Sequence, residues 1–119
     1  TSFAEFMENV APYVGDRWFD AIDEPMEDAL PSLGGTYGFC FYDADHTASA
    51  VAEFWALAHP LLADDCTLVF DDADWAEQST LRGLAEADGF VVVTDVEFYR
   101  PSGDKDDPLT YTLEVMRRG

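Results

Sequence analysis

Ionisable side chains gather where a short aromatic run near the middle of the chain ends, in the segment GFCFYDADHTASAV. Asp43, Asp45 and His46 stand where the pattern of a buried strand gives way to helix-forming residues. A second acidic pair, Asp71 and Asp72, follows the next apolar run, CTLVF. Carboxylates held close together either bind a cation or share a proton, and oxygen-only ligand sets favour Mg²⁺ or Ca²⁺.

His46 is a candidate for proton transfer, because neighbouring carboxylates favour its protonated form near neutral pH. The acids also have a plain structural explanation, since aspartate caps helices and each acidic group precedes a predicted helix. The run DADHTASAVAEF is not the calcium loop of helix–loop–helix proteins, because it lacks their glycine at position six and glutamate at position twelve. The other histidine, His59, precedes Pro60 at a predicted helix end and is expected to interact with the helix C-terminus.

The elements that position these residues alternate along the chain. Periodicity, turn residues and capping patterns predict helices over 2–11, from about 24 to 33, over 47–62 and over 74–87, a turn at 63–65, and strands over 17–22, 37–42, 66–70, 90–99 and 109–117. The expected capping residues are Ser2 with Glu5, Asp23, and Asp74 with Glu77. Strand 37–42 is apolar on both sides, as expected for a sheet with both faces covered. Strands that alternate with helices predict a Rossmann-like α/β fold with a mostly parallel sheet flanked by helices. The last two strands are joined only by a loop, which predicts a closing antiparallel hairpin. The length predicts one α/β domain over residues 1–119.

This fold class indicates where a ligand would bind. In open α/β sheets ligands lie outside the carboxyl ends of the strands. Two successive buried strands would bring Asp43 and Asp71 side by side at that edge. Asp23 and Glu24 follow the first predicted strand in the same way.

The charge balance is unusual, with 25 acidic and 6 basic residues and a formal net charge of -19. The 48% hydrophobic content favours a folded chain. Molar salt shortens the Debye length to about 3 Å and screens such self-repulsion, so the composition is typical of cytoplasmic proteins from salt-loving microbes. Without a basic patch, nucleic-acid binding is not expected. No signal segment and no apolar run of about 20 residues is present, so a membrane partner is not expected. Cys40 and Cys66 lie in apolar runs and are expected to be core thiols.

The stretch YGFCFYDADHTASAVAEFWALAHPLLADDCTLVFDDADW resembles the second half of class I S-adenosylmethionine-dependent methyltransferases. The likeness is to the group whose fourth strand ends in an aspartate–x–aspartate–histidine motif and whose fifth strand ends in paired aspartates. Residues 17–22 look like the third strand of that fold, and 90–117 look like its sixth and seventh strands.

The resemblance implies roles for the residues at the strand ends. Asp43, Asp71 and Asp72 match positions that hold a divalent cation such as Mg²⁺ in the catechol-type members. His46 matches a candidate general base, with Asp43 beside it as a second catalytic residue. The implied reaction is in-line transfer of a methyl group from the sulfonium of S-adenosylmethionine to an oxygen or nitrogen of a small-molecule acceptor.

The resemblance also implies how the cofactor is held. Asp23, Glu24 and Met26 match the stretch that borders the adenine, and Asp43 would lie against the cofactor as well. The family's first strand with its glycine-rich loop, and its second strand with the ribose-binding acid, have no counterpart here. Gly34 and Gly35 precede the wrong strand to replace that loop.

Two interpretations therefore stay open. The chain is either part of a longer methyltransferase, which the match of helix 2–11 to the helix after the missing second strand favours, or a non-catalytic binding or interaction domain on a truncated scaffold. A signalling receiver domain fits poorly, because the only lysine, Lys105, lies in a loop and not after the last parallel strand. In either case the sheet would expose an edge at strand 37–42, and such edges invite pairing into a homo-oligomer.

Overall fold

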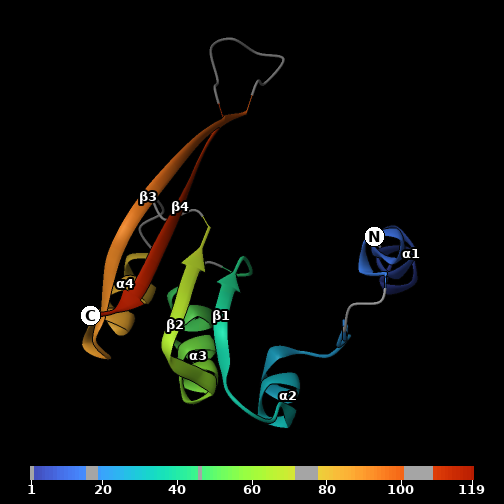
Figure 1. The fold of residues 1–119 in the computed structure, drawn as a ribbon, viewed down its shortest axis with the longest axis horizontal. Coiled ribbons are helices and arrows are strands. Elements are labelled where there is room, and N and C mark those ends of the chain that lie inside the picture. Colours follow the sequence, from blue (N-terminus) through green and yellow to red (C-terminus); the bar gives the residue numbers. More distant parts are fainter. Residues whose placement is uncertain (1, 16–18, 46, 72–77, 101–108) are drawn as a thin grey trace. The chain divides into compact units, whose positions relative to one another are not determined.

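The computed structural model describes residues 2–15, 19–45, 47–71, 78–100 and 109–119. The chain divides into two compact units, Thr1–Ser32 and Leu33–Gly119 (Figure 1). That they form the single domain predicted over 1–119 stays a prediction.

The first unit holds α1 (Phe3–Val14), α2 (Met26–Ala29) and the 3-10 turn η1 (Leu30–Ser32). The capping pattern predicted at Ser2 is confirmed, because its Oγ accepts a hydrogen bond of 3.1 Å from the Glu5 N–H. The helix runs through Pro12 to Val14 and stops at Gly15, whose φ of 57° favours glycine.

The predicted strand 17–22 is wrong where it can be checked, since residues 19–22 lie in no strand. A strand needs a neighbour for its backbone hydrogen bonds, and no strand in the described part of the chain pairs with this segment. The helix predicted after it is shorter than expected. Pro25 stands at the N-cap of α2 without a side-chain cap, so Asp23 does not cap this helix.

The second unit is a four-stranded sheet in the order β1-β2-β4-β3. Its strands are β1 (Tyr37–Tyr42), β2 (Leu62–Phe70), β3 (Phe90–Arg100) and β4 (Leu109–Arg118). β1 and β2 are parallel, whereas β4 pairs antiparallel with both β2 and β3. The mixed α/β sheet and its closing hairpin are therefore confirmed. β1 lies at the edge of the sheet, as expected.

Residues 63–65, predicted as a turn, belong instead to β2, which begins at Leu62. Their two aspartates suggest a loop, but Asp64 and Asp65 are exposed, where a strand tolerates charge. The helices α3 (Ala48–Ala58) and α4 (Gln78–Ala87), with the 3-10 turn η2 (His59–Leu61), make up the remaining structure.

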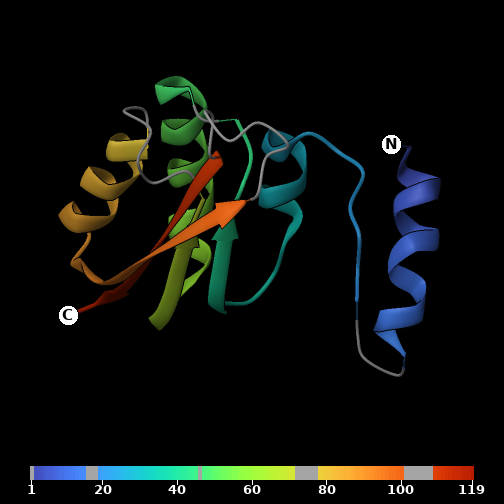
Figure 2. The ribbon, with the colours of Figure 1, turned by 90° about the horizontal axis from the view of Figure 1, so that it is seen from above.

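The helices α3 and α4 contact each other and lie over the same face of the sheet (Figure 2). The core between them and the sheet is formed by apolar side chains that are at most 7% exposed: Tyr42, Val51, Phe54, Trp55, Ala58, Leu62, Cys66, Leu68, Phe70, Leu81, Ala85, Phe90 and Met116. The alternate residues of β1, Phe39 and Phe41, point to the opposite face and are 61% and 48% exposed. The expectation that both faces are covered is thus wrong for the described part of the chain. Cys66 is buried as predicted, while Cys40 is only half-buried.

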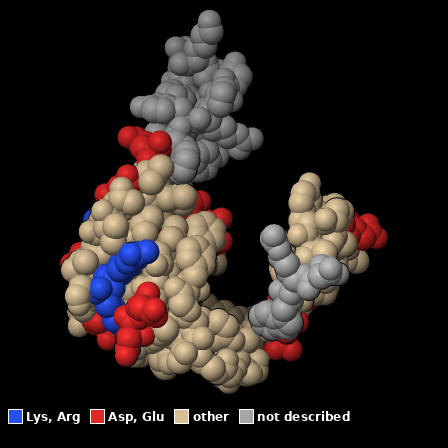
Figure 3. Space-filling model, in the orientation of Figure 1, with Lys and Arg blue, Asp and Glu red and all other residues tan. Residues whose placement is uncertain are grey.

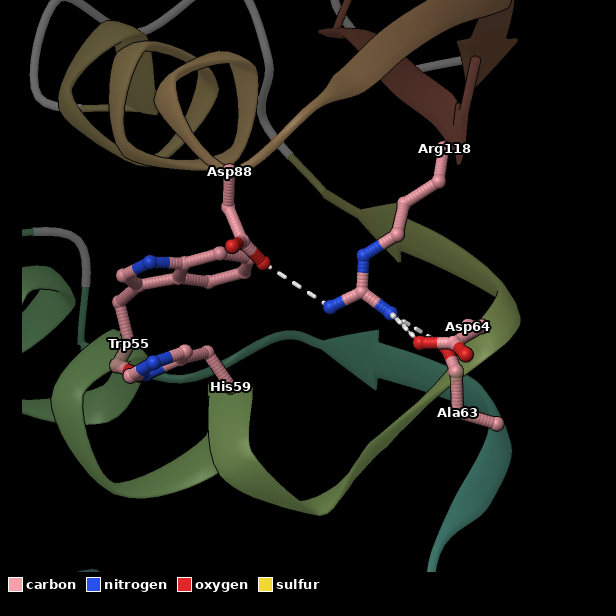
Figure 4. A network of polar contacts seen from close by, with 6 residues as sticks. All are labelled: Trp55, His59, Ala63, Asp64, Asp88 and Arg118. Atoms are coloured by element: carbon pink, nitrogen blue, oxygen red, sulfur yellow. Dashed lines mark hydrogen bonds and ion pairs between the residues drawn. The ribbon is translucent and has the colours of Figure 1, made fainter.

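Arg118, near the end of β4, ties three elements together at the amino-terminal end of β2 (Figure 4). Its Nη1–H donates to the Ala63 carbonyl at 2.6 Å, and its Nη2–H donates to Asp88 Oδ2 at 2.9 Å. Its guanidinium also lies 4.7 Å from the centroid of the Phe90 ring. The Asp64 Oδ1 lies 3.8 Å from the Arg118 Nη1 and completes this cluster. The cluster stabilises the end of the sheet where β2 begins, which is opposite to the end where β1 and β2 finish.

Candidate active site

The carboxyl ends of β1 and β2 lie side by side. Tyr42 and Phe70, the last residues of the two strands, are paired in a parallel register, and the Asp71 N–H donates to the Tyr42 carbonyl at 3.1 Å. Asp43 and Asp71 therefore leave the sheet from adjacent strands, in the same direction and at the same edge. The spatial relation expected from the sequence is confirmed for the backbone. The Asp71 side chain is half-buried, and that of Asp43 is exposed.

The turn after β1 is fixed by local hydrogen bonds. The Tyr42 hydroxyl donates to the Asp45 carbonyl oxygen, and the Tyr42 ring packs 4.3 Å from that of Phe54 on α3. Burial, together with the nearby Asp45 carboxylate, raises the pKa of Tyr42, so the hydroxyl keeps its proton and remains a donor. The Asp45 Oδ1 accepts from the Thr47 N–H at 2.9 Å.

Thr47, rather than an aspartate, caps α3. Its Oγ1 accepts from the Ala50 N–H at 3.3 Å. At α3, the explanation that the acids cap the helix thus holds only indirectly, because Asp45 bonds to Thr47, the residue that caps.

Two of the predicted site residues, His46 and Asp72, lie outside the described residues, as do Asp74 and Glu77 of the predicted capping pair. Their roles stay predictions. The described residues contain no group of three side chains that could hold a metal ion.

The residues predicted to border the cofactor belong to the first unit, apart from Asp43. Asp23 and Glu24 are exposed in the segment before α2, and Met26, the first residue of that helix, is half-buried. Their contact with a cofactor stays a prediction.

A buried ion pair beside the edge was not predicted from the sequence. Arg82 on α4 donates from Nε and Nη2 to the two carboxylate oxygens of Glu114 on β4, both at 2.5 Å. Glu114 lies between Thr112 and Met116 on its face of β4 and is fully buried, and a buried charged residue needs a partner. The partner lies 32 residues earlier in the chain, and no local pattern identifies it.

Basic side chains cover little of the face that Figure 3 shows, among the described residues. The arginines whose side chains the structure describes are all engaged: Arg82 with Glu114, Arg117 with the Thr67 hydroxyl at 3.1 Å, and Arg118 in the cluster above. Nothing in this part of the chain forms a patch suited to phosphates. No helix among the described residues is long and apolar enough to span a membrane.

The sequence profile of a methyltransferase domain matches residues 2–73, a range that includes both acidic strand ends. The chain belongs to this methyltransferase family. Its fold is that of the class I S-adenosylmethionine-dependent enzymes, as the resemblance implied. A search of curated proteins found no match.

Solved structures share the fold of this methyltransferase domain at low sequence identity. A Klebsiella pneumoniae protein described as an O-methyltransferase is 16% identical, with a TM-score of 0.58, and the match covers 94% of this chain and 55% of that one. A Thermoplasma acidophilum protein described as a methyltransferase is 11% identical with a TM-score of 0.58, over 97% and 52% of the two chains. Rv0187 from MTB, solved with a cofactor bound, is 20% identical with a TM-score of 0.55, over 98% and 57%. This domain therefore spans about half the length of the structures it matches.

Proposed function

We propose that this chain forms part of an S-adenosylmethionine-dependent methyltransferase that transfers a methyl group to a hydroxyl oxygen of a small molecule. The observation that carries the proposal is the register of β1 and β2, because it sends Asp43 and Asp71 out of one edge of a methyltransferase-family sheet. S-adenosylmethionine, when bound, would supply an electrophilic methyl group on a sulfonium. The residues of this chain would orient the acceptor and accept its proton.

We propose that Asp43 and Asp71 hold a divalent cation together with Asp72. The chemistry of the donors fits, because carboxylates on adjacent strand ends are the hard oxygen ligands that Mg²⁺ prefers. The described residues supply two of these ligands, and the third would come from Asp72. A cation held there would orient an acceptor hydroxyl and lower its pKa.

His46 is proposed as the general base, with Asp43 beside it. Both chain neighbours of His46 are anchored, Asp45 by the Tyr42 hydroxyl and Thr47 by the Asp45 carboxylate. Fixed neighbours on both sides would limit the freedom that a base at this position has to lose, which supports the proposal of proton transfer.

The cofactor's adenine is proposed to lie against Asp23, Glu24 and Met26, and Asp43 is proposed as a further cofactor-binding residue. The family match, which begins at residue 2 and includes this segment, supports that assignment. The acidic composition supports a working place in the salt-rich cytoplasm of a salt-adapted cell. Among the described strands, β1 is the outermost of the sheet, which supports the proposal of self-association through that edge.

Calorimetry of the full natural protein with S-adenosylmethionine in molar KCl tests the proposal. Saturable binding is expected, followed by transfer of labelled methyl groups from the cofactor to vicinal aromatic diols. His46→Gln should lower the transfer rate by about 100-fold or more. His59→Gln is the matched control and should leave the rate unchanged, because the Nδ1 of His59 lies 3.1 Å from the Trp55 carbonyl at the end of α3, as its sequence position predicted. Absence of cofactor binding would contradict the proposal and favour a non-catalytic binding domain.

A further inference from the structure

Glu114 is a charged side chain buried in the core of the second unit, with an exposed fraction of 1%. It lies on β4, on the face that α4 covers. A buried carboxylate is costly unless its oxygens are fully hydrogen-bonded and its charge is paired. One role of a buried charged group is to fix a particular arrangement of the residues around it.

Two elements meet at this carboxylate. Arg82 on α4 makes a two-pronged contact, with Nε and Nη2 each 2.5 Å from a different carboxylate oxygen, which fixes both distance and orientation. Asp95 is paired with Glu114 from β3, and its nearby acid group helps to raise the pKa of Glu114. The Arg82 charge further interacts with Asp95 and with Glu86 on its own helix.

The position of Glu114 in the sheet connects this cluster to the candidate site. A single row of paired residues crosses all four strands: Tyr42, Phe70, Glu114 and Asp95. Glu114 is therefore the neighbour of Phe70, the residue that precedes Asp71. Arg82 belongs to the first helix after Asp71 in the chain.

We propose that Arg82 and Glu114 are positioning residues for the candidate site, holding α4 on the sheet so that the chain leaving β2 presents Asp71 beside Asp43. Phe70, which precedes Asp71, pairs with Glu114, and Arg82 holds α4 to the same Glu114. Neither residue contacts the reacting groups, so their action is indirect. The expected effect on cation binding rests on the proposed cation site. The expected effect on the position of Asp71 rests on the backbone geometry alone.

The test compares Arg82→Lys with Arg118→Lys in the full chain, measuring two properties of each folded protein. Lysine keeps the charge but loses the two-pronged geometry. The first property is hydrogen exchange of the Asp71 amide, which donates to the Tyr42 carbonyl. The second is Mn²⁺ affinity, measured in molar KCl.

Arg82→Lys should speed exchange of the Asp71 amide and weaken Mn²⁺ binding, each by about tenfold. Arg118→Lys makes the same change at the other end of β4 and should alter neither. Glu114→Gln, which keeps the shape of the side chain, should repeat the Arg82→Lys result.

Unchanged Asp71 exchange in folded Arg82→Lys and Glu114→Gln would overturn the inference. Equal effects of Arg82→Lys and Arg118→Lys would do the same, because they would indicate general loosening. If the unsubstituted protein bound no Mn²⁺, the proposed cation site would be wrong, and the exchange of the Asp71 amide would still decide whether Arg82 and Glu114 position this edge.

Discussion

Replacing Arg118 by methionine removes a guanidinium that joins β4, β2 and the turn before β3 (Figure 4). The hydrogen bond to the Ala63 carbonyl, at 2.6 Å from a charged donor, contributes about 1.5–3 kcal/mol. The contact with the Phe90 ring adds about 0.5–1 kcal/mol. The ion pair with Asp88 is partly exposed and adds less than about 1 kcal/mol, which molar salt reduces further.

Since methionine keeps an apolar stem against Phe90, we expect Arg118→Met to lower the free energy of unfolding by about 2–3 kcal/mol. Equilibrium urea unfolding, followed by circular dichroism in molar KCl, measures this value. The midpoint should fall while the slope with urea stays constant.

Arg117→Met is the matched control, because it removes the same charge from the adjacent residue. The Arg117 side chain is exposed, and its Nε–H donates to the hydroxyl of the half-buried Thr67 at 3.1 Å. Its loss should cost less than about 0.5 kcal/mol. Equal destabilisation by the two substitutions would refute the reasoning, because the cost would then come from net charge and not from the geometry of the Arg118 contacts.

Three further predictions concern the thiols, the buried acid and the salt. Burial raises the pKa of Cys40 from 9.0 to about 11, so its thiolate population near neutral pH is about 100-fold lower than that of a free thiol, and disulfide reagents should react with it rapidly only after unfolding. Burial also raises the pKa of Glu114 above 4.5, partly offset by Arg82. The contribution of protonated Glu114 to stability is full below pH 4.5 and is lost as the pH rises through the raised pKa. The free energy of unfolding of the natural protein minus that of Glu114→Gln should therefore fall over that pH range. Lowering KCl from molar to about 0.1 M lengthens the Debye length from about 3 to 10 Å and should lower the urea midpoint.

Each of these predictions has a contradicting outcome. Rapid labelling of Cys40 in the folded protein would show that the thiol is not shielded. A stability difference between the natural protein and Glu114→Gln that rises above pH 4.5 would mean that Arg82 outweighs burial. A urea midpoint insensitive to KCl would remove the interpretation of the acidic surface as an adaptation to salt.

The strands and helices of the second unit were largely predictable, because local patterns specify them. The 3.6-residue spacing of Val51, Phe54, Trp55 and Ala58 marks α3, and all four are buried. The parallel pairing of the two strands that end at Tyr42 and Phe70 agrees with the rule that successive strands joined by a helix are parallel and usually adjacent. Local sequence and a topological rule were therefore enough to predict the edge at which Asp43 and Asp71 stand.

The errors came from features that depend on distant parts of the chain. The segment 17–22 has the composition of a strand, but strand formation depends on a partner that the local sequence does not reveal. Asp64 and Asp65 suggest a turn, yet β2 extends through them, and the distant Arg118 binds the Ala63 carbonyl there. The Arg82–Glu114 pair likewise joins residues that only the tertiary fold brings together.

The central claim is that Asp43 and Asp71 act together on one cation, and a double-mutant cycle of Mn²⁺ binding tests it most directly. Calorimetry in molar KCl would compare the natural protein with Asp43→Asn, Asp71→Asn and the double variant, with Asp88→Asn, at the opposite end of the sheet, as control. We expect each single substitution to weaken binding by at least about tenfold, and the double variant to lose much less than the product of the two, because both carboxylates bind the same ion. Affinities that match the control, or strictly multiplicative losses, would contradict a shared site.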